Sequence, residues 1–519
     1  MLLIPMAYLR RADFVPGGER GNIMSEAPFS RGADSAGSNT VGSSSQSATP
    51  HQSRATSGGA HDSLHSTPAS LVAACVHCGF CLPACPTYQL WGEEMDSPRG
   101  RIDLMRQTLD GTVKVDKMFA AHMDACLGCM ACMTACPSDV QYDQLIEATR
   151  AQIERTIPRS PGDRAYRSLI FWLFPYKERL RRAAYLGLLY KKSGLAKVMD
   201  SSGLLKALPS RLAALAELLP DVSAKELARA KKPFPDRISP KATARFRVGL
   251  QTGCVASVFF ANVHEATIRV LVAEDIEVVI PQGQGCCGAL SQHCGQADSL
   301  EFAQAMITLW ESVKVDFIVT NAAGCGSTLK DYYKLLGNDP KWAQRAKEFS
   351  QKVRDVMELL GSIELTSQMH PIAKKVAYHD ACHLAHAQKI RSEPRRVLSM
   401  IPQLELLEVP DGNTCCGSAG VYNLLQVEAA TDLGKRKANN IDSLSPDLVS
   451  AGNPGCLLQI ERYLASNTPL VHPIVILDAS ISGDLAMLSP KRRTKRALAS
   501  RERKHGPTEM VSTPPLSPR

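Results

Sequence analysis

The sequence of 519 residues contains no apolar run long enough to cross a membrane. A membrane-spanning helix needs about 18 or more consecutive apolar residues, and the most apolar stretch, SLIFWLFP at 168–175, is far shorter. The amino terminus, MLLIPMAYLRRADF, reaches charged residues too soon for the core of a signal peptide. These two absences argue against an integral membrane protein and a secreted protein, and we expect the chain in the cytoplasm. The sequence also lacks a P-loop, and we expect flavin binding in another chain.

Excess charge of one sign is almost absent from the body of the chain. The formal net charge is +9, but residues 491–519 carry nine Lys or Arg and two Asp or Glu, a net charge of +7. Residues 1–68 are neutral, so the residues between carry a net charge of only about +2. The body of the chain therefore has no charge pattern for binding nucleic acid.

The 17 cysteines need a chemical explanation. A disulfide framework is typical of small secreted domains, whereas this chain is long and shows no signal peptide. Many cysteines in a chain of the reducing cytosol instead indicate metal binding.

Composition and periodicity divide the chain into six segments. We expect a disordered extension at 1–68, a small domain with two cysteine clusters at 69–150, a helical connector at 151–245, a first α/β lobe at 246–370, a second α/β lobe at 371–488 and a disordered basic tail at 489–519.

The two lobes are tandem repeats. Four cysteine positions occur in both, displaced by 128 to 131 residues: Cys254, Cys286, Cys287 and Cys325 in the first, and Cys382, Cys415, Cys416 and Cys456 in the second. Strand-like runs such as FRVGLQTGC and KVAYHDAC precede these cysteines, and helix-like segments lie between the runs. Alternating strands and helices predict a parallel sheet in each lobe, with the cysteines at its carboxyl edge.

Two matching motifs lie in the segment 69–150. CVHCGFCLPACP and CLGCMACMTACP both read C-x2-C-x2-C-x3-C-P, and they are displaced by 51 residues. This pattern resembles that of ferredoxins with two [4Fe–4S] clusters, in which the fourth cysteine ligates the other cluster. The resemblance implies a small α+β domain for residues 69–150. The rule assigns four ligands to each cluster: Cys75, Cys78, Cys81 and Cys136 to cluster 1, and Cys126, Cys129, Cys132 and Cys85 to cluster 2. Structural zinc is the alternative, but it prefers two C-x2-C pairs separated by a longer loop.

The adjacent cysteines of the lobes indicate further iron–sulfur centres. Two neighbouring thiolates cannot easily bind one ion in ideal tetrahedral geometry, but they can reach different irons of a cluster. Gly288 and Gly417 follow the pairs and allow close backbone approach. Buried core thiols are the alternative, but a core role does not predict the same four positions twice. We expect one or two further clusters in the lobes, with the eight repeated cysteines as candidate ligands.

Several other residues have more than one interpretation. His379, His383 and His386 flank Cys382, where each could hydrogen-bond to sulfur, take part in proton transfer to a quinone, or cap a turn. Cys294 has no counterpart in the second lobe, and we expect a core thiol there. The stretch LIFWLFPYKERLRRAAYLGLLYKK mixes aromatic and basic residues, as an interfacial helix would, although packing between the lobes is the expected use.

On these motifs the lobes resemble the cysteine-rich CCG domain of heterodisulfide reductases and of the iron–sulfur subunits of several flavin-linked dehydrogenases. The fullest form of that family ends each copy in C-x-x-C, whereas here Thr328 and Gln459 occupy the last position. Residues 69–480 resemble more closely the iron–sulfur subunit of glycolate dehydrogenase, also called glycolate oxidase. The matching runs include CVHCGFCLPACPTYQLWGEEMDSPRGRI, ACLGCMACMTACPSDVQYDQLIE, YHDACHLAHAQ and CCGSAGVYNL.

The resemblance implies an electron-transfer subunit of an oxidoreductase complex, without catalytic residues of its own. A partner flavoprotein that contains FAD would oxidise glycolate to glyoxylate. This chain would pass the electrons towards a quinone or another acceptor, with the inner face of the cell membrane as a candidate place of contact. The alternatives are a subunit of a lactate or anaerobic glycerol-3-phosphate dehydrogenase, a subunit of a heterodisulfide reductase-like complex, and a stand-alone carrier or zinc scaffold.

Overall fold

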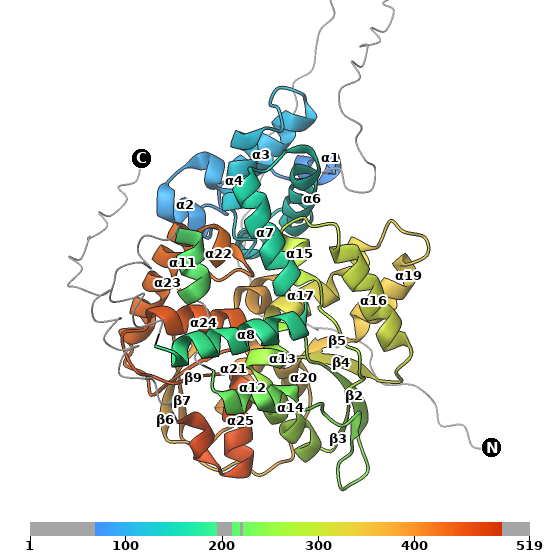
Figure 1. Cartoon of the computed structure of the whole chain (residues 1–519), viewed down its shortest axis with the longest axis vertical. Helices are drawn as coiled ribbons and strands as arrows, with labels where there is room; N and C mark the ends of the chain where they lie inside the picture. Colours follow the sequence, from blue (N-terminus) through green and yellow to red (C-terminus); the bar gives the residue numbers. More distant parts are fainter. Residues whose placement is uncertain (1–67, 195–209, 218–221, 490–519) are drawn as a thin grey trace, which may run out of the picture. The chain divides into compact units, whose positions relative to one another are not determined.

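A computed structural model describes residues 68–194, 210–217 and 222–489. The predicted extension at 1–68 and the predicted basic tail at 489–519 lie outside these ranges, apart from their innermost residues. In sequence order the described residues form a helical region, a set of connecting helices and two α/β lobes (Figure 1).

The region with the two cysteine motifs is helical, so the prediction of a small α+β domain is wrong. Between residues 68 and 156, all of which are described, the structure contains helices and loops but no strand. Its elements are α1 (Ala69–Ala73), α2 (Pro86–Trp91), η1 (Glu94–Asp96), α3 (Pro98–Leu109), α4 (Lys117–Ala125), α5 (Ala131–Ala135) and α6 (Tyr142–Thr156).

Helical periodicity explains this result. In α6 the buried residues Leu145, Ile146 and Ile153 recur at helical rather than strand spacing. Two helices also begin with N-caps: the side chain of Ser97 accepts a hydrogen bond from the amide of Gly100, and Asp116 caps α4 in the same way.

Connecting helices follow the cysteine motifs. They are α7 (Pro161–Leu173), α8 (Lys177–Lys192), α11 (Ser210–Glu217) and α12 (Ala224–Lys231). Within the described parts of the chain, no helix combines the length and the apolar character that a membrane span requires.

The first lobe is built on a five-stranded sheet with the order β1–β3–β2–β4–β5. The strands are β1 (Arg237–Ile238), β2 (Phe246–Gln251), β3 (Ile276–Val279), β4 (Phe317–Thr320) and β5 (Val353–Asp355). Its helices are α13 (Val255–Phe259), α14 (Ala261–Ala273), α15 (Ala289–His293), α16 (Ser299–Glu311), α17 (Ala323–Lys330), α18 (Tyr332–Leu335), α19 (Ala343–Lys352) and α20 (Val356–Ser362). The predicted parallel pairing is confirmed for β2 to β5, whereas the edge strand β1 pairs antiparallel with β3. A strand of two residues is too short to give a sequence pattern.

The second lobe repeats this arrangement with the order β7–β6–β8–β9, and all its strands are parallel. The strands are β6 (Lys374–His379), β7 (Leu404–Glu408), β8 (Leu448–Ala451) and β9 (Leu470–Val471). Its helices are η2 (His383–Ala387), α21 (Ser392–Ser399), α22 (Tyr422–Leu425), α23 (Val427–Asp442), α24 (Pro454–Tyr463), α25 (Pro473–Ser482) and η3 (Leu485–Leu488).

The strand order places the repeated cysteines. In each lobe the first strand of the repeat lies between the second and the third. The second strand is therefore added on one side of the first strand and the third strand on the other side. Open α/β sheets bind ligands at this switch point, beyond the carboxyl ends of the strands. Cys254 and Cys325 follow β2 and β4, and Cys382 and Cys456 follow β6 and β8.

The two lobes share one apolar core. Leu271 on α14 and Ile476 on α25 belong to the same buried cluster. Arg269, on α14, also forms an ion pair of 2.5 Å with the buried carboxylate of Asp478 on α25. The cysteines of both sheets are therefore held in one packed unit.

Candidate metal centres

The structure gathers the eight cysteines of the two motifs around two small pockets. The first pocket is lined by Cys75, Cys78, Cys81 and Cys136, together with Cys132. The second is lined by Cys85, Cys126, Cys129 and Cys132. Each pocket thus receives three cysteines of one motif and the last cysteine of the other, and Cys132 borders both.

The backbone has the same shape in both cysteine loops. His77 and Gly79 in the first loop have φ angles of +57° and +86°, and Gly128 and Met130, 51 residues later, have φ angles of +65° and +61°. Non-glycine residues rarely adopt this left-handed conformation, and such strain is concentrated at functional sites. In the second loop it turns the amide of Gly128 to within 3.3 Å of the Cys126 Sγ, to which it donates a hydrogen bond.

Two buried arginines set the electrostatics of the second loop. Burial would raise the pKa of Cys126, but the positive charges of Arg101 and Arg150 outweigh this effect, so the pKa of Cys126 lies below its usual value. Burial raises the pKa of Cys129 and of Cys132 instead. Arg101 is fully buried and donates hydrogen bonds to the carbonyls of Asp96 and His122.

Arg150 joins this loop to the first lobe. Its guanidinium donates to the carbonyls of Met123 and Cys126 in the motif region and, over 2.8 Å, to the carbonyl of His293 at the end of α15. The imidazole of His293 is also 2.8 Å from the carboxylate of Glu147 on α6. The sequence analysis missed both contacts, because their partners lie more than 140 residues apart and leave no local pattern.

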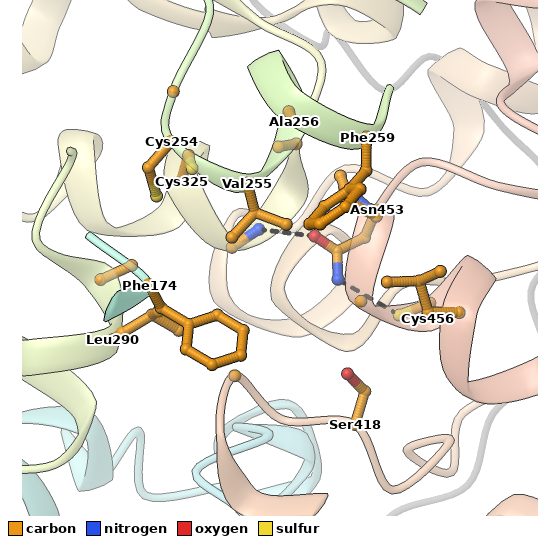
Figure 2. Close-up of a pocket in the computed structure, with 18 of the residues that line it drawn as sticks. Phe174, Cys254, Val255, Ala256, Phe259, Leu290, Cys325, Ser418, Asn453 and Cys456 are labelled. Carbon is orange, nitrogen blue, oxygen red and sulfur yellow. Dashed lines mark hydrogen bonds between the residues drawn. The ribbon is translucent and has the colours of Figure 1, made fainter. Parts of the chain in front are cut away.

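All eight repeated cysteines of the lobes line one cavity of about 440 Å³. The Sγ atoms of Cys254 and Cys286 are 3.5 Å apart, and those of Cys382 and Cys415 are 3.8 Å apart. Figure 2 shows Cys254 and Cys325 on one side of the cavity and Cys456 on the other. Two thiol sets from two different sheets therefore face a common space.

The glycines after the paired cysteines are required by the backbone. Gly288 and Gly417 have φ angles of +76° and +86°. A Cβ atom on Gly417 would lie 2.7 Å from the carbonyl oxygen of Ala430. In the first lobe the amide of Gly288 donates to the Cys286 Sγ at 3.3 Å.

Asn453 links the lobes at the cavity. Its side-chain amide donates to the Cys456 Sγ at 3.4 Å, and its side-chain oxygen accepts a hydrogen bond of the same length from the amide of Gly324 in the first lobe (Figure 2). A hydrogen bond to a cysteine sulfur adjusts the electron density of a metal centre that the sulfur binds.

The residues at the last CCG position carry no thiol, and their side chains have different surroundings. Gln459 donates to the carbonyl of Ala430 and accepts from Asn423, so its side chain is occupied. Thr328 is buried, and its hydroxyl has no hydrogen-bond partner. Each lobe therefore offers four repeated thiols.

The three histidines near Cys382 have different surroundings. His386 bonds to the hydroxyl of Thr134 and to the carbonyl of Asn413, which supports the structural interpretation. The Nδ1 of His383 is 3.6 Å from the Cys382 Sγ, and its ring lies 4.8 Å from that of His293. His379 is buried without a hydrogen-bond partner at either ring nitrogen.

Two further sequence features can now be placed. Cys294 packs against an apolar cluster that includes Tyr166, as expected for a core thiol, and burial raises its pKa. Residues 283–288, GQGCCG, have the spacing of a dinucleotide-binding fingerprint, which the sequence analysis overlooked. Both cysteines of this run line the cavity with the other thiols, so the run belongs to the thiol site.

The thiol sets fit iron–sulfur clusters. All seventeen cysteines lie in the described parts of the chain, and none forms a disulfide. The donors are soft sulfur atoms in desolvated pockets, and backbone or side-chain amides point at several of them. Such a donor set suits iron–sulfur clusters, for which each motif pocket offers at least four thiols.

Comparison with known protein families gives matches in the motif region, the connecting segment and both lobes. Residues 71–140 match the 4Fe-4S dicluster domain, residues 162–219 match the linker region of the glycolate oxidase iron-sulfur subunit, and residues 248–330 and 376–461 match the cysteine-rich domain. These matches confirm the prediction of iron–sulfur clusters and of two cysteine-rich repeats.

Individual relatives agree with these domains. The chain is 38% identical over 394 residues to the probable glycolate oxidase iron-sulfur subunit of Bacillus subtilis, a match that spans 75% of this chain and 88% of the relative. It is 34% identical over 417 residues to the glycolate oxidase iron-sulfur subunit of Escherichia coli, a match that spans 79% of this chain and 95% of the relative. Lactate utilization protein A of Bacillus subtilis is 25% identical over 241 residues, which is 45% of this chain and 99% of that protein.

Proposed function

The chain belongs to the glycolate oxidase iron–sulfur subunit family, and from this premise we propose that it carries electrons from a glycolate-oxidising flavoprotein to an acceptor at the lobe cavity. The partner would contain FAD and convert glycolate to glyoxylate. Bound iron–sulfur clusters would supply one-electron transfer. The proposed ligands are Cys75, Cys78, Cys81 and Cys136 for one cluster, Cys126, Cys129, Cys132 and Cys85 for another, and the eight repeated cysteines for the centres of the lobes.

The observation that supports this proposal most is the unbroken order of the thiol sets. Cys132 borders both motif pockets. Cys129, from the second pocket, packs in the same buried cluster as Cys382 and Cys415 of the second lobe. These two cysteines line the cavity that also contains the thiols of the first lobe. The thiols therefore form one continuous series from the first pocket to the cavity.

The first pocket is the end at which a partner would dock. Cys78 is exposed, and the side chains of Val76 and Phe80 beside it are 66% and 65% exposed. Large apolar side chains with this exposure are typical of protein contact sites when they lie together. We assign this surface to the flavoprotein.

The cavity is the end at which an acceptor would bind. Its lining is mostly apolar, with Phe174, Leu180 and Ala184 from the segment of α7 and α8. Apolar cavities with a few polar groups suit small organic ligands. His293 and Asn453 supply such polar groups here. A quinone has this combination of an apolar ring and hydrogen-bond acceptors.

The outer face of the same helices supports peripheral contact with the inner face of the cell membrane. Trp172, Leu189 and Leu186 are 55%, 62% and 67% exposed, respectively. Exposed Arg182 and Lys192 lie on α8 as well. Interfacial helices combine apolar and basic side chains in this way to bind anionic lipids. Flotation with anionic vesicles tests this contact: the Leu186→Glu/Leu189→Glu double variant should lose binding, and equal binding of wild type and variant would contradict it.

Substrate oxidation by the reconstituted complex tests the proposal. The chain and its flavoprotein partner, purified together without oxygen, should reduce an artificial quinone with glycolate as the electron donor. Lactate and glycerol 3-phosphate serve as comparison substrates. Activity with lactate but not with glycolate would favour the second candidate, a lactate-oxidising complex. The match to lactate utilization protein A supports this candidate. Glycolate oxidation by this chain without the flavoprotein would contradict the subunit role.

A further inference from the structure

Equivalent positions in the two lobes hold different residues. Gln251 ends β2 three residues before Cys254, and His379 ends β6 three residues before Cys382. Both side chains are buried, at 2% and 1% exposure. The repeat therefore places an amide in the first lobe where it places an imidazole in the second.

Gln251 has a structural role in the first lobe. Its side-chain oxygen accepts a hydrogen bond of 3.1 Å from the indole nitrogen of Trp310, which is itself buried. This contact fixes the amide against α16. The oxygen of this amide thus has a structural role, whereas its nitrogen has no hydrogen-bond partner.

His379 has no such contact. Neither ring nitrogen has a hydrogen-bond partner, although the residue is almost completely buried. Buried polar groups are nearly always paired, because an unpaired one loses its hydration without compensation. An imidazole with both nitrogens unpaired points to a partner that the protein chain does not itself supply.

The second lobe places two thiols beside this imidazole. A ring nitrogen of His379 and the Sγ atoms of Cys416 and Cys456 all lie within 4.8 Å of one another. Within the described ranges of the chain, this is the one group of three His, Cys, Asp or Glu side chains with metal-ligand proximity. The position of the missing last cysteine is taken by Gln459, whose amide is already bonded to Ala430 and Asn423.

We propose that His379 is a nitrogen ligand of the iron–sulfur centre in the second lobe, together with Cys416 and Cys456. The inference rests on the proposed function in one respect, namely that this lobe binds iron. It makes the two lobes chemically different, since the first lobe has an amide, Gln251, at the equivalent position. Replacing an anionic thiolate by a neutral imidazole raises the reduction potential of an iron–sulfur cluster. The centre of the second lobe would then be the better electron acceptor of the two.

Pulsed EPR spectroscopy of the full chain, purified without oxygen and poised at oxidised, half-reduced and reduced potentials, tests the ligand directly. The wild type should show the strong nitrogen coupling of a coordinated imidazole. In protein from cells grown with ¹⁵N-histidine, the ¹⁴N coupling should be replaced by a ¹⁵N coupling. The His379→Gln variant, which copies the first lobe, should lose this coupling. His383→Gln is the matched control, since His383 is next to Cys382 and 3.6 Å from its sulfur, and it should keep the coupling.

A second variant distinguishes the loss of the ligand from a failure of the protein to fold. His379→Cys supplies a thiolate in place of the imidazole, so it should retain iron, lose the nitrogen coupling and lower the potential of that centre. If the wild type contains iron but none of its three samples shows strong histidine coupling, the ligand assignment is wrong and the proposed function still stands. The same holds if the coupling persists in His379→Gln. Wild-type protein without iron would overturn the proposed function as well.

Discussion

The hydroxyl of Tyr422 donates a hydrogen bond of 3.0 Å to the main-chain carbonyl of Ala125. Tyr422 lies on α22 of the second lobe and is buried, and Ala125 directly precedes Cys126. The hydrogen bond therefore fixes the second cysteine loop against the lobe at the point where their thiol sets are neighbours.

Removal of this hydroxyl should weaken the contact. Tyr422→Phe leaves the buried carbonyl of Ala125 without its donor, which should lower the free energy of unfolding by about 1 kcal/mol. Anaerobic urea unfolding measures the change. Tyr333→Phe is the control, since Tyr333 is 47% exposed, and an equal effect of both variants would show that the buried contact is unimportant.

Iron content in double variants tests the exchange of the fourth ligand between the motifs. Cys85→Ser should cost about four irons per chain, because a serine hydroxyl is a poor cluster ligand. Adding Cys129→Ser should cost no more, since both residues line the second pocket, whereas adding Cys78→Ser should cost about four more. The opposite pattern would mean that each motif holds its own cluster.

The glycine after the second cysteine pair should be intolerant of a side chain. Gly417→Ala would combine a left-handed backbone with a contact of 2.7 Å to the carbonyl oxygen of Ala430. We expect the free energy of unfolding to fall by at least about 2 kcal/mol. The second lobe should also lose its iron. Gly283→Ala separates the two causes, because Gly283 has a φ of +82° but no atom within 4 Å of the added Cβ. It should cost about 1 kcal/mol and leave the iron content unchanged.

Asp355 should make stability depend on pH. Burial raises its pKa to about 7, from an ordinary value of 3.8. The folded chain therefore binds this proton more tightly than the unfolded chain, so stability falls as the pH rises through this range and is lowest above pH 7. Between pH 6 and pH 8 the loss should be about 1 kcal/mol.

The Asp355→Asn variant should remove this loss. Asparagine can still accept the hydrogen bond from the amide of Met357 that begins α20, but it cannot ionise. Thermal unfolding at the two pH values measures the difference, with Asp110→Asn as an exposed control. A pH dependence that is the same in wild type and in Asp355→Asn would refute the assignment.

The sequence predicted the features that depend on local spacing. Runs such as FRVGLQTGC and KVAYHDAC correctly indicated β2 and β6, and the family matches bear out two iron–sulfur motifs and two cysteine-rich repeats. The α+β prediction for the first domain failed because it followed the analogy with ferredoxins and not the helical spacing of Leu145, Ile146 and Ile153.

Contacts between distant segments could not be predicted. Arg150 reaches His293, and Asn453 reaches Gly324, because packing brings separate elements together. A single sequence carries no periodic trace of such pairs. The difference between His379 and His386 was hidden for the same reason, since both flank Cys382 in the sequence and only their surroundings distinguish them.

Iron and acid-labile sulfide, measured on protein purified without oxygen and followed by EPR during reductive titration, test the central claim most directly. The account predicts at least about eight irons and eight sulfides per chain, with signals of two interacting [4Fe–4S] clusters and further signals from the lobes. Zinc in place of iron, or protein without acid-labile sulfide, would contradict it.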